Sequence, residues 1–219
     1  MSLSPQVLLS NAARDICIAK LKELPQFIYA GKTKSMYRAS VLVPIIIQNE
    51  EVHLLYTLRS SNLKSHSGQV SFPGGKMDGM EGVIDTALRE TEEEIGIPGN
   101  SIDIWSAMPT VQGRDKQMYI TPVVGFIKDL DMKNLIPNVH EVEEIFSVPM
   151  SAFCNSENQA HLMFEGWPLP LFTHGKHKIW GITGFITHLF LQCFLPSDLY
   201  KCDFMRKSYT IDELLPSKL

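Results

Sequence analysis

An acidic run, Glu90-Thr-Glu-Glu-Glu94, limits how this chain can fold more than any other feature of its sequence. The apolar spacing around it predicts a helix over residues 82–95, which Gly96 would end. At about 100° per residue, Glu90, Glu93 and Glu94 share an arc of about 100° on adjacent turns. A neighbouring arc carries the residues expected to face the core, which are Ile84, Ala87, Leu88, Thr91 and Ile95. The fold must therefore bury one side of this helix and gather three carboxylates beside it.

The simplest interpretation of an acidic run is a solvated helix face. However, like charges three or four residues apart destabilise a helix by roughly 0.2–0.5 kcal/mol per pair. The helix dipole also disfavours negative charge near the C-terminal end, where this run lies. A divalent cation would reverse the repulsion, and clustered carboxylate oxygens suit Mg²⁺ or Mn²⁺. The acidic cluster therefore predicts a metal site.

Residues before and within the helix are placed to support such a site. Gly74 and Gly75 let the preceding loop bend sharply, so that its main-chain groups approach a ligand or metal closely. Arg89 can pair with Glu93, four residues further on, or reach Glu81 in the loop. We interpret Arg89 and Glu81 as residues that orient and support the site.

The segment from residue 75 to residue 97 resembles the Nudix box, G-x5-E-x7-R-E-U-x-E-E-x-G-U, where U is a bulky apolar residue. The matching polar and glycine positions are Gly75, Glu81, Arg89, Glu90, Glu93, Glu94 and Gly96. Thr91 departs from the pattern, because it stands in place of an aliphatic residue. The resemblance implies an α/β fold, a Nudix-type α/β/α sandwich with a mixed sheet in a single domain. It also implies hydrolysis of a nucleoside diphosphate linked to another moiety.

Carried over by position, the Nudix resemblance makes Glu90, Glu93 and Glu94 the ligands of Mg²⁺ or Mn²⁺ and, with Arg89, catalytic residues. Such ions polarise phosphoryl oxygens, activate the attacking water and stabilise the leaving oxygen. The general base of this superfamily comes from the box helix or from a later loop. Glu141 lies in a segment, residues 138–149, that resembles a family segment bringing carboxylates to the site, and it is our candidate outer ligand or base. A charged strand-edge loop is the alternative interpretation of that segment.

A second motif, upstream of the box, resembles the coenzyme A signature of one Nudix subfamily, L-L-T-x-R-[SA]-x3-R-x3-G-x3-F-P-G-G. The matching residues are Thr57, Arg59, Ser60, Gly68, Phe72, Pro73, Gly74 and Gly75. Tyr56 is inserted, and Lys64 replaces the second arginine, which keeps the charge but loses the bidentate fork. Coenzyme A needs an anion site for its 3′-phosphate as well as its pyrophosphate, and Arg59 and Lys64 are candidates for it. The predicted substrate-binding residues are Arg59, Lys64, Gly74 and Gly75.

On these motifs the chain is identified as a member of the peroxisomal coenzyme A diphosphatase subfamily of Nudix hydrolases. The resemblance implies metal-dependent hydrolysis of the pyrophosphate of coenzyme A (CoA) and acyl-CoA, giving 3′,5′-ADP and (acyl-)4′-phosphopantetheine. One alternative is a diphosphatase of another nucleotide, NADH or ADP-ribose. Another is a non-catalytic Nudix fold that binds CoA or a nucleotide, although the intact set Arg89, Glu90, Glu93 and Glu94 argues against it.

The rest of the chain reads as a mixed α/β protein with one core. Strands are expected over residues 40–47, 52–58, 68–72, 102–111, 118–127 and 143–148, and helices over residues 5–23 and 182–195. The predicted division is an N-terminal helix packing on the domain within residues 1–30, a Nudix hydrolase domain at residues 31–196 and a C-terminal tail at residues 197–219. Val7, Leu8, Ala12, Ile16, Ala19 and Leu24 are expected to form the buried stripe of the first helix.

Composition narrows the class of partner. Lys and Arg number 20 against 24 Asp and Glu, so the formal charge of -4 does not favour binding to nucleic acid or an anionic membrane. The four cysteines are scattered without a metal-binding spacing. The longest apolar stretch, residues 179–195, is shorter than the ~20 residues that a bilayer span needs. We therefore expect no nucleic-acid partner and no membrane span, and the resemblance to the coenzyme A signature implies a small-molecule substrate, CoA or acyl-CoA.

The final tripeptide, Ser217-Lys218-Leu219, matches a receptor-read address for the peroxisome. A chance polar tail is the alternative, since the motif fixes only three residues. The prediction at this point is a peroxisomal protein that engages an import receptor through Ser217, Lys218 and Leu219.

Overall fold

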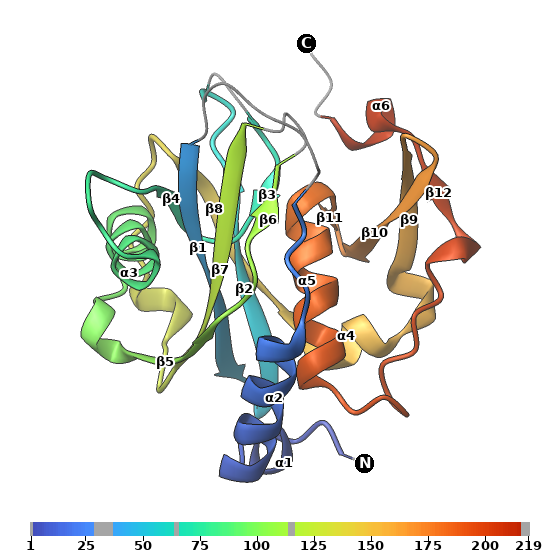
Figure 1. Cartoon of the computed structure of the whole chain (residues 1–219), viewed down its shortest axis with the longest axis horizontal. Helices are drawn as coiled ribbons and strands as arrows, with labels where there is room; N and C mark the ends of the chain where they lie inside the picture. Colours follow the sequence, from blue (N-terminus) through green and yellow to red (C-terminus); the bar gives the residue numbers. More distant parts are fainter. Residues whose placement is uncertain (1, 29–36, 64–65, 114–116, 216–219) are drawn as a thin grey trace.

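The computed structural model describes residues 2–28, 37–63, 66–113 and 117–215. Its larger sheet has the strand order β3-β2-β1-β7-β5, with β4 paired to β1, β6 to β7 and β8 to β2. These strands are β1 (Tyr37–Gln48), β2 (Glu51–Arg59), β3 (Val70–Ser71), β4 (Gly74–Lys76), β5 (Ile102–Ala107), β6 (Val111–Gln112), β7 (Met118–Ile127) and β8 (Val142–Pro149). β1 and β7 run parallel and the other pairs are antiparallel, so the sheet is mixed, as predicted (Figure 1).

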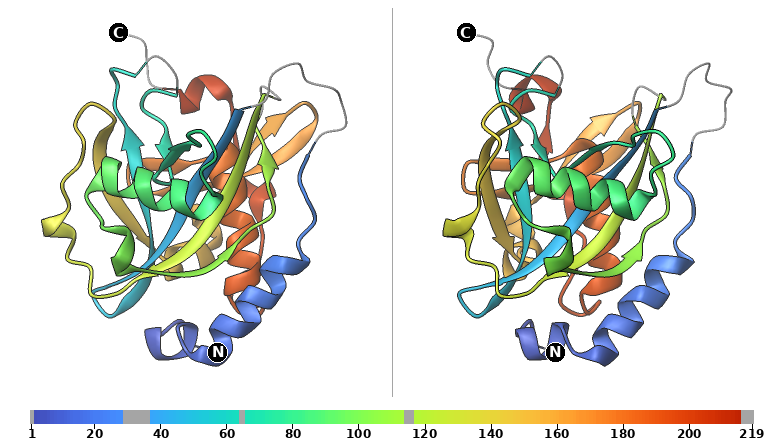
Figure 2. Two further views of the ribbon diagram at one scale, coloured as in Figure 1. Left: turned by 60° about the vertical axis from the view of Figure 1, so that its left-hand side comes forward. Right: turned by 90° about the vertical axis from the view of Figure 1, so that its left-hand side faces the viewer.

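β1 lies inside the sheet because both of its faces are apolar. Leu42 packs into a cluster with residues of α3 (Val83–Ile95), whereas the next residue, Val43, packs into a cluster with residues of α5 (Gly181–Phe194). Alternate residues of a strand point to opposite faces, so a continuous apolar run suits a strand covered on both sides. Figures 1 and 2 show α3 on one face of the sheet and α5 on the other. The predicted α/β/α sandwich in a single domain is confirmed.

α3 carries the acidic run and is ended by Gly96, as predicted. Gly96 adopts φ 73, the left-handed conformation that glycine tolerates best, and its N–H donates to the carbonyl of Glu92. Thr91 is buried in the core-facing arc, where its hydroxyl donates to the carbonyl of Ala87 at 2.6 Å. This bond satisfies the polar group that replaces an aliphatic residue. Ile84 was predicted to face the core but is exposed.

A second, four-stranded sheet has the order β11-β10-β9-β12 and was not predicted. Its strands are β9 (Gln159–Phe164), β10 (Trp167–His174), β11 (His177–Ile179) and β12 (Ser208–Tyr209). Pro168 and Pro170 within β10 obscured its strand pattern, because proline lacks the N–H that a ladder uses. Short helices lie between the strands of both parts of the fold: η1 (Gly99–Ser101) and η2 (Met132–Asn134) beside the larger sheet, and α4 (Met150–Cys154), η3 (Ser156–Asn158), η4 (Phe204–Arg206) and α6 (Ile211–Leu214) toward the second sheet.

Two local predictions differ from the structure. The strand predicted over residues 102–111 is divided into β5 and β6, and the interruption contains Pro109, which lacks the N–H that a strand ladder uses. The helix predicted over residues 5–23 is two helices, α1 (Pro5–Leu8) and α2 (Asn11–Glu23). Ser10 starts α2 by accepting a hydrogen bond from the N–H of Ala13 at 3.2 Å, and its extended backbone interrupts the helix.

The buried stripe of α2 also differs from the prediction. Cys17 and Leu21 are buried, whereas Ile16 is 57% exposed. Because apolar residues stand on both faces of this helix, their spacing alone did not identify the face that packs. Within the described residues, no helix is both long enough and apolar enough to cross a membrane.

Candidate active site

The last two turns of α3 lie against β4, and this contact brings carboxylates onto a glycine backbone. The N–H of Gly74 donates to Oε2 of Glu94 at 3.2 Å. A Cβ atom at Gly75 would overlap the carboxylate of Glu90. Glycine at these positions therefore lets the backbone and the carboxylates approach closely, while the predicted approach of this loop to a ligand or metal stays a prediction.

Glu94 is the most enclosed of these acids, with 3% of its side chain exposed. Burial raises the pKa of Glu94 to about 8, and the carboxylates of Glu141 and Glu90 push it in the same direction. The hydrogen bond from Gly74 and the positive charge of Arg59 oppose that rise. Near neutral pH this carboxyl group is therefore poised between its protonated and ionised forms.

Arg89 organises the loop before α3. Its Nε and Nη2 donate to the two carboxylate oxygens of Glu81 at 2.9 and 3.0 Å, a bidentate pair. Nη2 also donates to the carbonyl of Lys76 at 3.1 Å. The pair with Arg89, aided by a hydrogen bond from Thr86, lowers the pKa of Glu81 to about 2. Glu81 and Arg89 thus hold the loop against the helix.

Glu90 and Glu93 both contact the same guanidinium. Nη1 of Arg89 lies 3.0 Å from Oε1 of Glu90 and 3.0 Å from Oε2 of Glu93. Glu90 is largely buried, and burial raises its pKa against the opposing effect of Arg89, while Glu93 and Glu141 add to the rise. The side chain of Glu93 is 57% exposed, so it lies at the outer side of the cluster.

Glu141 reaches the cluster from outside the helix. The N–H of Asn138 donates to the carbonyl of Glu94 at 2.8 Å, which ties the loop before β8 to the end of α3. The carbonyl of Glu141 accepts from the N–H of Ser60 at 2.8 Å, and Asn138 donates to its carboxylate at 3.4 Å. Asn138 was not among the predicted site residues. It precedes Glu141 by three residues, a spacing typical of a turn. The structure brings Glu141 close enough for its charge to raise the pKa of both Glu90 and Glu94.

Arg59 lies at the end of β2 and points at the acids. Its Nη1 is 4.0 Å from Oε1 of Glu94, so it faces the carboxylates directly. Its Nε is buried and has no hydrogen-bond partner among the described residues. A buried donor without a partner costs free energy, and an anion at this position would supply the acceptor. Lys64, the other predicted cation, lies outside the described residues.

The chemistry of the donor set fits a hard divalent cation. The charge of Glu141 raises the pKa of both Glu90 and Glu94, Glu90 also raises the pKa of Glu94, and a bound cation would relieve that repulsion. As the side chains stand, no group of three or more His, Cys, Asp or Glu in the described part of the chain is arranged to hold a metal ion. Arg89 instead neutralises Glu90 and Glu93. An ion would therefore require these side chains to reorient.

Residues 36–165 match the family model of the NUDIX domain. Among curated proteins, the mouse protein named mitochondrial coenzyme A diphosphatase NUDT8 is 40% identical over 183 residues, covering 80% of this chain and 84% of its own length. The human protein of the same name is 41% identical over 165 residues, covering 72% and 70%. Nudix hydrolase 3 of Caenorhabditis elegans is 34% identical, covering 78% of each chain.

A solved structure agrees at the level of the fold. The MutT/nudix family protein from Enterococcus faecalis superposes with a TM-score of 0.51 and 17% sequence identity, covering 86% of this chain and 71% of that chain. At this identity the likeness concerns the arrangement of elements alone.

The predicted peroxisomal location is wrong, because the mouse and human relatives are named as mitochondrial proteins. A tripeptide specifies too little to outweigh similarity that extends over most of the chain. Ser217, Lys218 and Leu219 lie outside the described residues, and we no longer assign an import receptor to them.

Proposed function

This chain belongs to the Nudix hydrolase family, and from that premise we propose that it cleaves the pyrophosphate of coenzyme A and its thioesters. The products would be 3′,5′-ADP and (acyl-)4′-phosphopantetheine. The observation that carries the proposal is the coenzyme A diphosphatase name of relatives that are 40% and 41% identical to this chain over the aligned residues. Arg59, from the coenzyme A signature, supports it by facing the acidic cluster with a buried, unpartnered donor.

We propose Glu90, Glu93 and Glu94 as the residues that would hold Mg²⁺ or Mn²⁺, with Glu141 as an outer ligand or base. Such ions, when bound, lower the pKa of water and polarise phosphoryl oxygens. Glu94 has to lose its proton to act as a ligand, so binding of a cation would release a proton near neutral pH.

The other side chains bind and orient in this proposal. Arg59 donates to a phosphate oxygen of the substrate, and Gly74 and Gly75 let the backbone approach it. Arg89 is held in place by Glu81 and positions Glu90. Water adds across the P–O–P bond, so that one phosphate gains the water oxygen, the other keeps the bridging oxygen and a proton is released. We assign the acceptance of that proton to Glu141, and its electrostatic effect on Glu90 and Glu94 supports the assignment.

The test is product analysis of the purified chain with Mg²⁺ or Mn²⁺. Coenzyme A, acetyl-CoA, NADH and ADP-ribose are incubated separately at equal concentration, and products are resolved by chromatography. We expect 3′,5′-ADP and the matching phosphopantetheine from the first two substrates, with higher kcat/KM than for NADH or ADP-ribose. A higher kcat/KM for NADH or ADP-ribose than for coenzyme A would mean that the substrate is that nucleotide rather than coenzyme A. Recovery of all four intact would overturn the proposed activity.

As part of the same proposal we adopt a mitochondrial location from the names of the mouse and human relatives.

A further inference from the structure

A second arginine, Arg38, lies on the face of the sheet that carries the acidic cluster. In the pairing of β1 with β4, Ser40 is opposite Gly75, the residue against which the Glu90 carboxylate packs. Paired residues of antiparallel strands share a face, and so do residues two apart on one strand. Arg38 therefore lies on the same face as Gly75 and Glu90, about 7 Å along β1 from Ser40. Its side chain is exposed.

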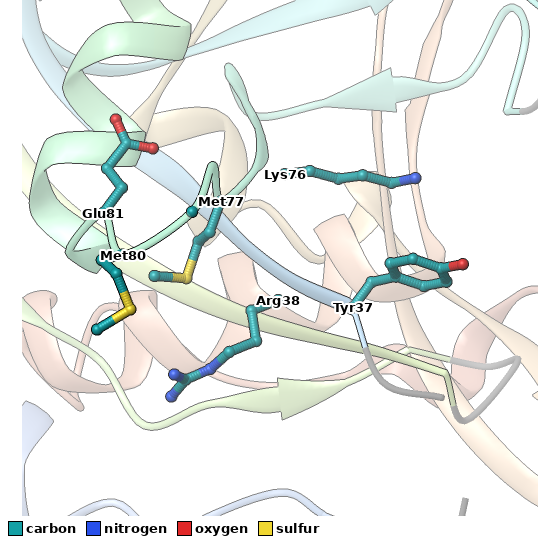
Figure 3. Close-up of a pocket in the computed structure, with 7 residues that line it drawn as sticks. Tyr37, Arg38, Lys76, Met77, Met80 and Glu81 are labelled. Carbon is teal, nitrogen blue, oxygen red and sulfur yellow. The ribbon is translucent and has the colours of Figure 1, made fainter. Parts of the chain in front are cut away.

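Arg38 lines two adjoining cavities. One, of about 360 Å³, is lined by Tyr37, Arg38, Lys76, Met77, Gly79, Met80 and Glu81 (Figure 3). The other, of about 370 Å³, is lined by Ile28, Arg38, Thr110, Tyr119 and Thr121. Each has a volume within the range that holds small ligands. Because Arg38 is common to both, its guanidinium is available to a group that extends from one cavity into the other.

The side chains around Arg38 offer contacts for a nucleoside. Nζ of Lys76 lies 4.7 Å from the centre of the Tyr37 ring, but Lys76 pairs with Ala39, so these two side chains belong to the other face of the sheet and extend away from Arg38 (Figure 3). In the second cavity the hydroxyls of Thr110 and Thr121 are 2.9 Å apart, next to the ring of Tyr119. Aromatic rings stack on bases, and hydroxyls bond to ribose or phosphate oxygens. The combination of Arg38, Tyr119 and the two threonines in the second cavity suits a phosphorylated nucleoside.

Arg59 does not account for binding of the separate phosphate of the substrate. It was predicted to serve the separate phosphate, but it faces Glu94 at 4.0 Å and therefore belongs with the carboxylates at which the pyrophosphate would react. A substrate with a third phosphate needs another cation away from that point. Arg38 lies on the same face and belongs to the start of β1, where the strand runs beside β7.

We propose that Arg38 binds the ribose 3′-phosphate of the substrate and is the residue by which the enzyme distinguishes 3′-phosphorylated nucleotides from those that lack this group. The inference rests on the proposed function for its substrate class. Arg38 is a specificity-determining residue here, because the phosphate it binds takes no part in bond cleavage.

Binding of two probes tests the role without any reaction. Adenosine 3′,5′-bisphosphate and adenosine 5′-monophosphate, which differ only in the 3′-phosphate, are titrated calorimetrically into the wild type and the variants Arg38→Gln, Arg38→Lys and Lys128→Gln. The wild type should bind the bisphosphate at least about tenfold more tightly, as expected for a charge-assisted contact. Arg38→Gln should remove most of that preference while changing the monophosphate affinity less than about twofold. Arg38→Lys should retain part of it. Lys128→Gln, at an exposed site beyond the far end of β7, should match the wild type.

Other outcomes overturn the assignment. Equal weakening of both probes in Arg38→Gln would mean that Arg38 binds the 5′-phosphate or supports the fold. If Arg38→Gln keeps the wild-type preference for the bisphosphate over the monophosphate, the 3′-phosphate is bound by another residue. If the wild type shows no such preference, the protein does not bind the 3′-phosphate. If Arg38→Gln does not fold, Arg38→Lys provides the test. Its ratio of bisphosphate affinity to monophosphate affinity should be lower than that of the wild type, because lysine lacks the bidentate fork. Kinetics with coenzyme A and dephospho-CoA separate this inference from the proposed function. If neither compound is cleaved, the proposed function is contradicted. If they are cleaved and the ratio of their kcat/KM values is the same in the Arg38 variants as in the wild type, only the role of Arg38 is contradicted.

Discussion

Replacing Glu94 with glutamine should make the metal-free protein more stable at alkaline pH, even though it removes a proposed metal ligand. The side chain is 3% exposed, and burial raises its pKa from the ordinary 4.5 to about 8. Glutamine keeps an oxygen that accepts from the N–H of Gly74, the bond seen at 3.2 Å. The substitution therefore removes a buried charge and leaves the local hydrogen bond in place.

The magnitude follows from linkage between proton binding and folding. Below about pH 4.5 the carboxyl group is protonated in both the folded and the unfolded protein. Between about pH 4.5 and 8 the unfolded chain releases the proton and the folded protein keeps it, so the free energy of unfolding falls as pH rises. The slope approaches about 1.4 kcal/mol per pH unit, and a pKa difference of about 3.5 units sets an upper limit of about 5 kcal/mol. We expect Glu94→Gln to gain about 2–4 kcal/mol relative to the wild type between pH 5 and pH 9.

The assay is denaturant unfolding in EDTA at pH 5, 7 and 9, comparing the change with pH rather than absolute stabilities. Glu92→Gln is the matched control, because Glu92 is an exposed glutamate on the same helix. Addition of Mn²⁺ at pH 8 should stabilise the wild type more than the variant, since a bound ion favours the ionised carboxylate. Parallel pH profiles for the wild type and Glu94→Gln would refute the reasoning, because they would mean that the Glu94 carboxylate is not desolvated in the folded protein.

Three further substitutions test the support of the site and the N-terminal helices. Gly75→Ala should lower kcat by at least about tenfold at unchanged fold, because its methyl group would displace the Glu90 carboxylate; a wild-type rate would contradict the close packing. Glu81→Gln should lower activity about 10–100-fold by freeing Arg89, with Mn²⁺ titration of the rate as the second measurement; an unaltered titration would show that Arg89 is held by other groups. Ser10→Ala should cost about 1 kcal/mol and lower Tm by roughly 2–4 °C through loss of the α2 cap, and an unchanged Tm would mean that α2 contributes little to global unfolding.

The sandwich and the carboxylate cluster could be predicted because they follow from strong local periodicities. The continuous apolar run in β1 requires cover on both faces, and the spacing of apolar and acidic residues in α3 separates its core side from its site side. The resemblance to the Nudix box added the sheet type and the roles of individual acids. These features depend on residues close together in the sequence, so little tertiary information was needed.

Other features depend on contacts between distant segments. β10 is a strand despite two prolines, because β9 and β11 flank it. Arg59 was expected at a separate anion site but faces Glu94, a placement set by the pairing of β2 within the sheet. Asn138 was missed because its backbone bond to the carbonyl of Glu94 and its side-chain bond to Glu141 depend on how the loop before β8 meets the end of α3. The alternation of side chains along a strand gives such placements only once the register is known.

The short pairing of β12 with β9 makes the last part of the chain a protective element for the second sheet. Ser208 and Tyr209 are the residues that cover β9 on the side away from β10, and Leu214 is buried in the small apolar cluster nearby. A chain cut before η4 would leave the N–H and C=O groups of β9 open to pairing with another molecule. Truncation there should therefore appear first as self-association, while the acidic helix on the opposite layer keeps its own packing.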